Sequence, residues 1–248
     1  MNDGEPAIRL EHVSKAFGER KVLEDVSFQV AAGEAFCLLG RSGTGKSVTL
    51  KVMIGLIKPD QGKIFIQGNE IQNLDPAKLA EARKKVGFLF QNAALFDSIS
   101  VSENVAFPLR RHAHKSEEEI RAVVHEKLQE VELGEEGDKM PAELSGGMRK
   151  RAGLARALSL DPGILLIDEP SSGLDRITAA EIYKLLLDLK KKRNVTLVVV
   201  THDVTGARTF ADRFAVLVKG KISACGTADE LAQSEDPLVR ELAVGSET

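Results

Sequence analysis

The chain has 248 residues, 43% of them hydrophobic, which is enough to bury a full core in one domain or in one domain with a subdomain. Its 34 basic and 37 acidic residues leave a formal net charge of −3, so it lacks the positive field that drives nonspecific nucleic-acid binding. No stretch approaches the roughly 18 to 20 apolar residues of a membrane span, and the N-terminus lacks a signal-peptide pattern. We therefore expect a cytosolic chain that does not itself form a pore and does not bind nucleic acid.

Hydrophobic patterning predicts strands that alternate with helices, without an internal repeat or a low-complexity linker. The segments 8–13 and 22–30 alternate apolar and polar residues, as a half-buried antiparallel pair does. Strands covered on both faces are predicted from compact apolar runs at 35–39, 86–90, 164–167 and 195–200. Helical periodicity appears at 117–131, 146–160 and 178–191. The almost strand-free segment of about 92–160 predicts a helical subdomain inserted into an α/β core with a mainly parallel sheet.

The sequence GRSGTGKS follows the apolar run 35–39 and precedes a helix-like stretch. In that context, the backbone N–H groups of a glycine-rich loop and a helix N-terminus form a cradle for phosphates. Lys46 would neutralise the charge of the β- and γ-phosphates, and the Ser47 hydroxyl would bind Mg²⁺. The residues expected to bind nucleotide here are Gly40, Arg41, Ser42, Gly43, Thr44, Gly45, Lys46, Ser47 and Val48.

The sequence ILLIDEP places two carboxylates at the end of a buried strand, where α/β sheets bind ligands. Asp168 is suited to hold Mg²⁺, and Glu169 is suited to polarise an attacking water. Taken alone, the pair also fits a polar strand end at a turn. The preceding glycine-rich loop favours the catalytic interpretation.

The stretch ELSGGMRKRAGLARAL carries a second helix N-terminus that favours an anion, at Ser145, Gly146 and Gly147. One nucleotide per chain is explained most simply if this site binds the γ-phosphate held by another copy, which predicts a head-to-tail dimer with ATP between the subunits. The residues alone leave an internal contact open. A run of cations follows, which either attracts phosphate or, as we expect, forms a solvated surface: Arg149, Lys150, Arg151 and Arg156.

These motifs, with the glutamine of FLFQN, SSGLD and the histidine of VVVTHD, occur in the order found in ATP-binding-cassette ATPases, which the chain resembles over residues 7–233. The resemblance implies a P-loop NTPase fold with a RecA-like core, an N-terminal antiparallel β subdomain and an inserted helical subdomain. It also implies ATP hydrolysis with Mg²⁺ by a dimer.

The resemblance also assigns further residues. Gln91 would couple the Mg²⁺ and water site to the helical subdomain, and Asp175 would lie in the dimer-contacting loop. His202 would contact the γ-phosphate, although its place at a strand end fits a polar cap equally well. Phe17 stands where the family most often has the tyrosine that stacks on adenine, and Met148 stands where it most often has glutamine. Neither departure removes a charged catalytic group, so we expect an active enzyme.

The segment FQNAALFDSISVSENVAFPLR is apolar for a connection, as expected for a groove facing a transmembrane partner. With LSGGMRKRAGLARAL and DPLVREL, it most resembles the ATPases of bacterial Mla/Mce-type lipid transporters. That resemblance implies a permease, a lipid-binding MCE protein and often a small regulatory subunit as partners. It also implies a phospholipid cargo and a peripheral location on the cytoplasmic face of the inner membrane. A transporter of amino acids, metals or drugs is the alternative.

Two other classes of function fit less well. Cassette proteins that act on ribosomes or DNA ends usually carry tandem cassettes or a long coiled-coil insertion, and this sequence has one set of motifs without such an insertion. A small-molecule kinase would need an acceptor pocket and no LSGG element.

The C-terminal tail, 234–248, predicts a short helix starting at Pro237, with Leu238, Leu242 and also Val239 on one side. Such a short helix must dock or stay disordered. We expect docking across the dimer, with packing on its own cassette and fraying as the alternatives. The two cysteines, Cys37 and Cys225, are predicted to be reduced packing residues rather than a disulfide or a metal pair.

Overall fold

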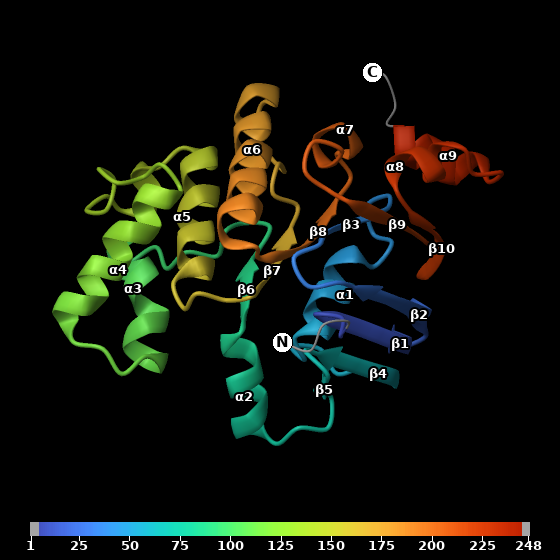
Figure 1. The fold of residues 1–248 in the computed structure, drawn as a ribbon, viewed down its shortest axis with the longest axis horizontal. Helices are drawn as coiled ribbons and strands as arrows, with labels where there is room; N and C mark the ends of the chain where they lie inside the picture. The colour runs from blue at the N-terminus through green and yellow to red at the C-terminus, as the bar shows by residue number, and fades with distance from the viewer. Residues whose placement is uncertain (1–4, 245–248) are drawn as a thin grey trace.

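The computed structural model describes residues 5–244, which form two β-sheets flanked by helices (Figure 1). The larger sheet has six strands in the order β10–β9–β3–β8–β7–β6, all paired in parallel except β10, which runs antiparallel to β9. Its strands in chain order are β3 (Ala35–Leu39), β6 (Val86–Leu89), β7 (Ile164–Asp168), β8 (Thr196–Thr201), β9 (Arg213–Val218) and β10 (Lys221–Gly226). The predicted mainly parallel sheet is confirmed, and every residue of β3, β7 and β8 is buried, as strands covered on both faces require.

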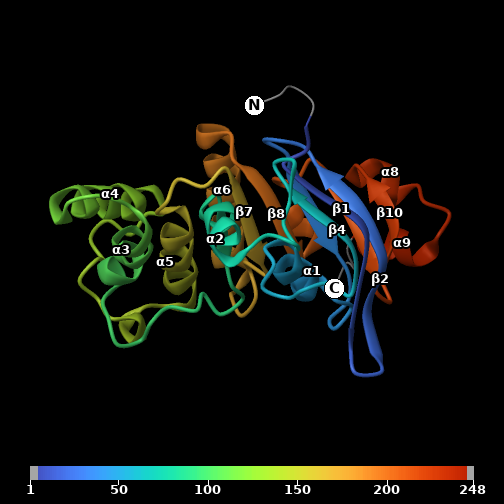
Figure 2. The same cartoon turned by 90° about the horizontal axis from the view of Figure 1, so that it is seen from below.

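The smaller sheet is antiparallel, as predicted from the alternating pattern of the first two strands. Its order is β2–β1–β4–β5, and its strands are β1 (Ile8–Phe17), β2 (Arg20–Val30), β4 (Gln61–Ile66) and β5 (Asn69–Glu70). The helix α1 (Lys46–Met53) lies between the two sheets (Figure 2). Phe36 and Leu38 of β3 pack in this layer with α1 and with the inner face of the small sheet. A further helix, α2 (Pro76–Lys84), follows β5.

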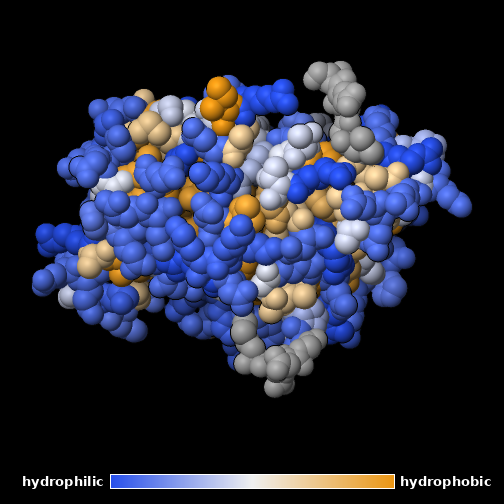
Figure 3. Space-filling view, turned by 45° about the horizontal axis from the view of Figure 1, so that its top comes forward, coloured by the Kyte–Doolittle hydropathy of each residue, from blue (hydrophilic) through white to orange (hydrophobic). Residues whose placement is uncertain are grey.

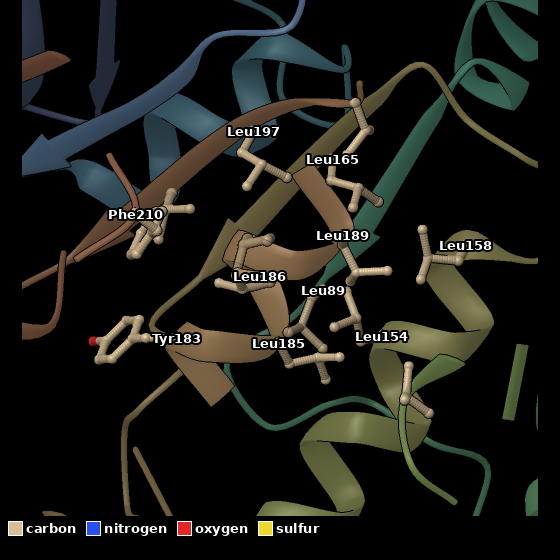
Figure 4. Packing of buried hydrophobic residues seen from close by; sticks show 14 of the residues in the cluster. Leu89, Leu154, Leu158, Leu165, Tyr183, Leu185, Leu186, Leu189, Leu197 and Phe210 are labelled. Carbon is tan, nitrogen blue, oxygen red and sulfur yellow. The ribbon is translucent and has the colours of Figure 1, made fainter. Parts of the chain in front are cut away.

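The other face of the large sheet is covered by helices, and its core contains the alternate residues Cys37 and Leu39 of β3. The helices that contribute residues to this core are α3 (Val101–His112), α4 (Glu117–Glu130), α5 (Gly146–Leu158), α6 (Arg176–Arg193), α7 (Val204–Ala207), α8 (Ala228–Ala232) and α9 (Pro237–Val244). Figure 4 shows leucines of α5 and α6 meeting leucines of the strands, with Tyr183 stacked on Phe210 at 5.5 Å between ring centroids.

The segment 92–160 contains α3, α4, the 3-10 turn η1 (Pro141–Glu143) and α5, and it contains no strand. Figures 1 and 2 show these helices gathered on one side of the molecule, away from the small sheet. Three of the helices start after a serine whose hydroxyl accepts a backbone N–H of the first turn: Ser100, Ser116 and Ser145. The helices predicted at 117–131, 146–160 and 178–191 are all present, with ends that differ by one or two residues.

The predicted helix at Pro237 is present as α9, but its apolar side meets the same chain. Val239 and Ala243 are buried in the large core, and Leu242 packs against that core. Val239, Leu242 and Ala243 thus pack on their own cassette, which was the alternative given for the tail, whereas docking of Leu238 across a dimer stays a prediction. The last residues of the tail, 245–248, lie outside the described residues.

Both cysteines are free, but only Cys37 is the buried packing residue that was predicted. Cys225 is exposed on β10, because that strand forms the edge of the sheet and alternates half-buried with exposed positions up to Cys225. Most of the surface seen in Figure 3 is hydrophilic, with small separate hydrophobic patches. Among residues 5–244, no helix combines the length and the apolar character needed to cross a bilayer.

Candidate functional site

Four neighbouring strands deliver the predicted motifs to one edge of the large sheet. Gly40 follows β3, His202 follows β8, Glu169 follows β7, and Gln91 lies two residues after β6. These strands are adjacent in the order β3–β8–β7–β6 and run in parallel, so their carboxyl ends share an edge. Segments far apart in the sequence thereby meet where α/β sheets bind ligands.

The glycine-rich loop needs its glycines for steric reasons. A Cβ on Gly40 would lie 2.7 Å from the carbonyl oxygen of Leu217, and Gly45, which precedes α1, has a left-handed φ of 109°. Lys46 is buried and bends back over the loop, where its Nζ donates to the carbonyls of Gly40 (2.8 Å) and Arg41 (3.3 Å). The ammonium group of Lys46 therefore lies within the loop, beside the backbone of its first two residues.

The other loop residues divide between the surface and the core. The exposed ones are Arg41, Ser42 and Gly43. Arg41 forms a 3.0 Å ion pair with Glu241 of α9, so the C-terminal helix contacts the loop directly. The Thr44 hydroxyl donates to the Arg41 carbonyl (2.9 Å), and Val48 packs against the core between the sheets.

Ser47 and Asp168 are brought together from opposite halves of the sequence. The Ser47 hydroxyl donates to Oδ1 of Asp168 at 2.8 Å, and burial raises the pKa of that carboxyl group. A hydroxyl and a carboxylate are the hard oxygen ligands that Mg²⁺ accepts alongside water and phosphate. Within residues 5–244, no three His, Cys, Asp or Glu side chains gather as a complete metal site. The pair thus fits a metal whose other ligands come from a nucleotide.

The carboxylate of Glu169, in the ILLIDEP motif, contacts residues of two other motifs. Its Oε1 lies 3.3 Å from Nζ of Lys46, and its Oε2 lies 2.8 Å from Nδ1 of His202. Its backbone is left-handed, with φ of 48°, and its N–H donates to the Val200 carbonyl at 2.9 Å. Glu169 is 7% exposed, whereas 61% of the His202 side chain is exposed. The carboxylate therefore lies inside the site, and the imidazole lies at its rim.

Gln91 and Phe17 lie at the borders of this site. Gln91 is exposed, and its amide donates to the Ser172 hydroxyl at 3.3 Å. Within the described part of the chain, no hydrogen bond joins it to Ser47 or Asp168. Phe17 is 49% exposed and pairs across the β1–β2 hairpin with Arg20, whose guanidinium lies 3.5 Å from the Gly43 carbonyl. The hairpin end that carries Phe17 is therefore next to the glycine-rich loop.

The second predicted anion site lies at the start of α5. The Ser145 hydroxyl accepts the Met148 N–H at 3.2 Å. Positions 146 and 147 face Leu174 and Thr178, close to the Asp175 carboxylate that caps α6. Among the hydrogen bonds and ion pairs of residues 5–244, none joins this site to the glycine-rich loop of the same chain.

The cations that follow were expected on a solvated surface, and for two of them this was wrong. Lys150 and Arg151 are 5% and 8% exposed, and Arg151 bonds to Glu132 and Glu181. The Lys150 Nζ donates to the backbone carbonyls of Gln91 and Glu169, and burial lowers its pKa. Lys150 precedes the buried Leu154 by one helical turn. That spacing was the signal, because it puts the lysine on the apolar side of α5.

The ABC transporter family model matches residues 23–172. A curated relative, "Probable ribonucleotide transport ATP-binding protein mkl" of Mycobacterium leprae, is 47% identical over 96% of this chain and 69% of its own length. "Intermembrane phospholipid transport system ATP-binding protein MlaF" of Haemophilus influenzae is 41% identical over 92% of this chain and 87% of its own.

Solved structures give the same result for the fold. A dimeric bacterial ABC transporter cassette superposes with a TM-score of 0.83 and 35% identity, covering 89% of this chain and 98% of that one. A post-hydrolysis dimer bound to ADP and phosphate gives a TM-score of 0.82 at the same identity and coverage. The resemblance predicted from the ordered motifs is thereby confirmed: the chain belongs to the ABC transporter family, as an ATP-hydrolysing cassette subunit.

Proposed function

We propose that the chain powers phospholipid transport between bacterial membranes by hydrolysing ATP within a membrane-bound complex. The observation that carries the catalytic part is the position of Glu169, whose two carboxylate oxygens contact Lys46 and His202 at the edge of the large sheet. This arrangement holds a general base beside the cation expected to bind phosphate.

We assign the phosphates to the loop of residues 40–47, whose backbone and Lys46 are preorganised to receive them. Ser47 and Asp168 would hold Mg²⁺, with Gln91 approaching from the helical side. When bound, Mg²⁺ would neutralise charge on the phosphate oxygens.

Arrival of the γ-phosphate would draw Lys46 away from Glu169. The Glu169 carboxylate would then accept a proton from the attacking water, while His202 would orient its second oxygen and contact the phosphate. Phe17 would stack on the adenine ring, because its hairpin borders the loop.

A second copy of the chain would complete the site with Ser145, Gly146 and Gly147, aided by the loop containing Asp175. Among residues 5–244, no hydrogen bond or ion pair joins this segment to the glycine-rich loop of its own chain, which supports that assignment. The carboxylate of Asp175 is engaged by its own helix α6, so we assign the loop backbone rather than this side chain to the dimer contact.

The permease would bind a groove beside the helices α3 and α5. Two hollows of about 370 and 500 Å³ adjoin there and share Phe96 and Phe107, which are 45% and 44% exposed. The rings lie 4.8 Å apart between centroids. An exposed aromatic pair in a groove fits an apolar helix of a membrane protein, and it would place the chain peripherally at the cytoplasmic face of the inner membrane.

The cargo is inferred from relatives, because it would cross the permease rather than this subunit. The MlaF relatives of two genera support phospholipid. An MCE protein and a small regulatory subunit are proposed as partners from the resemblance to Mla/Mce-type ATPases. The name of the mycobacterial relative favours ribonucleotide as a second candidate. These relatives favour phospholipid over an amino-acid, metal or drug cargo.

The test is to purify the complex with its permease and to identify co-purified molecules by mass spectrometry. The complex is then placed in vesicles containing labelled phospholipid. We expect bound phospholipid and lipid transfer that requires ATP, with a complex carrying Glu169→Gln as the inactive control. ATP-dependent movement of ribonucleotide without lipid transfer would contradict the proposal.

A further inference from the structure

Lys150 is a buried cation that faces two backbone carbonyls of the site. Its Nζ lies 2.5 Å from the oxygen of Gln91 and 2.8 Å from the oxygen of Glu169. The first belongs to the loop after β6, the second to the loop after β7, and the lysine itself to α5. One ammonium group therefore joins the helix that begins at the second anion site to both loops.

Both loops contain residues in strained backbone conformations, which contacts with other parts of the chain must stabilise. Glu169 has φ of 48°, and Ala93 and Ala94, shortly after Gln91, have φ of 57° and 50°. Left-handed conformations are uncommon for residues other than glycine and persist where surrounding contacts fix them. The Arg156 guanidinium, also on α5, donates to the carbonyls of Ala93 and Ala94. Two cations of α5 thus hold the loop of Gln91, but only Lys150 also holds Glu169.

Stability alone does not explain a lysine at this position. Removing an ammonium group from water is costly, and an apolar side chain of similar volume in such a place is often neutral or stabilising. The bonds of Lys150 go to backbone carbonyls, and the nearby charges of Asp168 and Glu169 only partly offset the cost of burial. A buried lysine that costs stability is better explained if its ammonium group positions other residues of the site.

We propose that Lys150 is a positioning residue for ATP hydrolysis. It holds the backbone of Glu169 and Gln91 in a fixed position relative to the start of α5. Its ammonium group donates to the backbone of Glu169, so in our proposal it acts through Glu169 rather than on the reacting atoms. When a second copy engages the start of α5, Lys150 would transmit the position of that helix to the carboxylate. The inference rests on the proposed role of Glu169 as general base.

The first test is Lys150→Met, which keeps the length of the side chain and removes the donor. We expect kcat to fall by about 10- to 100-fold, since small misplacement of a catalytic group costs that much. ATP affinity, measured by titration with a fluorescent ATP analogue, should stay within about 2-fold because the phosphate loop is untouched. Lys184→Met, which removes an exposed cation of α6, serves as the matched control. Turnover of Lys150→Met near that of wild type overturns the proposal.

The variant Arg156→Met distinguishes the effect of the Gln91 loop on turnover from that of Glu169. It removes support from the Gln91 loop and leaves Glu169 held, so its kcat should fall clearly less than that of Lys150→Met. Equal losses would overturn the assignment to Glu169. If Lys150→Met does not fold, judged by circular dichroism, Lys150→Leu replaces it with the same expected outcomes.

The decisive measurement is a double-mutant cycle in single-turnover experiments. Once Glu169→Gln has removed the base, Lys150→Met should lower the rate by less than about 2-fold, whereas a merely structural lysine would cost the same factor in both backgrounds. Additive losses overturn the proposal. If Glu169→Gln itself hydrolyses ATP at the wild-type rate, the proposed function of Glu169 is what fails. If only Lys150→Met does so, the positioning role alone fails.

Discussion

The Glu169 side chain is held by a cation on one oxygen and an imidazole on the other, on a backbone with φ of 48°. A left-handed conformation at a non-glycine residue costs roughly 1–3 kcal/mol. With this backbone conformation, the carboxylate reaches Lys46 past the end of β8, the strand that lies between β7 and β3. The contacts of the Glu169 carboxylate are therefore made at the cost of a strained backbone conformation.

Glu169→Gln should leave the fold and ATP binding intact, because the amide has the shape of the carboxylate. Its turnover should fall by at least about 100-fold, since an amide does not accept the proton of water. Phosphate release measures the first effect, and titration with a fluorescent ATP analogue measures the second. Lys46→Ala provides the contrast, because loss of its charge should weaken nucleotide binding itself. Hydrolysis by Glu169→Gln near the wild-type rate would contradict the assignment.

The contact between β6 and α5 is close enough to depend on the absence of a side chain. A Cβ on Gly87 of β6 would lie 2.4 Å from the Ala157 carbonyl of α5. Gly87→Ala should therefore destabilise the protein by about 1–3 kcal/mol through overpacking, as measured by urea unfolding. Gly163→Ala is the control, because its Cβ would meet only the Gln67 amide at 3.5 Å. Equal stability of the two variants would show that β6 and α5 can separate without cost.

The helices α3 and α4 are joined at one corner by Arg110, which bonds to Glu103 and Glu117. Its guanidinium holds the pKa of both carboxyl groups below their ordinary value of 4.5. Because these pKa values are lower in the folded state, the pair stabilises the fold above about pH 4.5 and loses this contribution as pH falls through the folded pKa values. The contribution is small, since the groups are largely exposed.

Arg110→Gln should therefore lower the melting temperature slightly at pH 7, and the difference from wild type should shrink under acidic conditions near pH 3. Thermal unfolding followed by circular dichroism at both pH values provides the measurement. Arg111→Gln, at an exposed neighbouring position, controls for the loss of one positive charge. A difference that is equally large in acid would show that Arg110 acts through packing rather than through the carboxylates.

At the scale of the whole molecule, the two halves of the nucleotide site lie on separate copies in our proposal. A mixture of Lys46→Ala and Gly146→Asp chains should then form some dimers with one intact composite site, whereas each homodimer has none. ATPase activity of the mixture should exceed that of both parents. Mass spectrometry of the intact dimers verifies that mixed pairs are present. Activity no higher than the parents in a sample containing them would contradict the composite site.

The strands β3, β6, β7 and β8 were predictable because each is a continuous apolar run, whereas β9 and β10 were not predicted. The sheet edge was predictable because the phosphate and carboxylate motifs directly follow two of those runs, β3 and β7. The inward direction of the Lys150 side chain was missed, because a run of cations is usually solvated and that rule was given more weight than the one-turn spacing between Lys150 and Leu154. The partner of α9 was not predictable either. Its helical pattern reveals an apolar side, but the surface that this side covers is formed by distant parts of the chain.

The positions of the two thiols have a practical consequence for following this subunit at work. Burial raises the pKa of the Cys37 thiol and removes it from reagents, whereas Cys225 is exposed on the outer strand β10. A maleimide dye should therefore attach once per folded chain and reach the second cysteine only after denaturation. The natural sequence thus offers a single attachment site for a fluorophore, on an edge strand that bears none of the motifs, without an engineered cysteine. Energy transfer between dyes on two copies would then report their approach and separation during each round of hydrolysis.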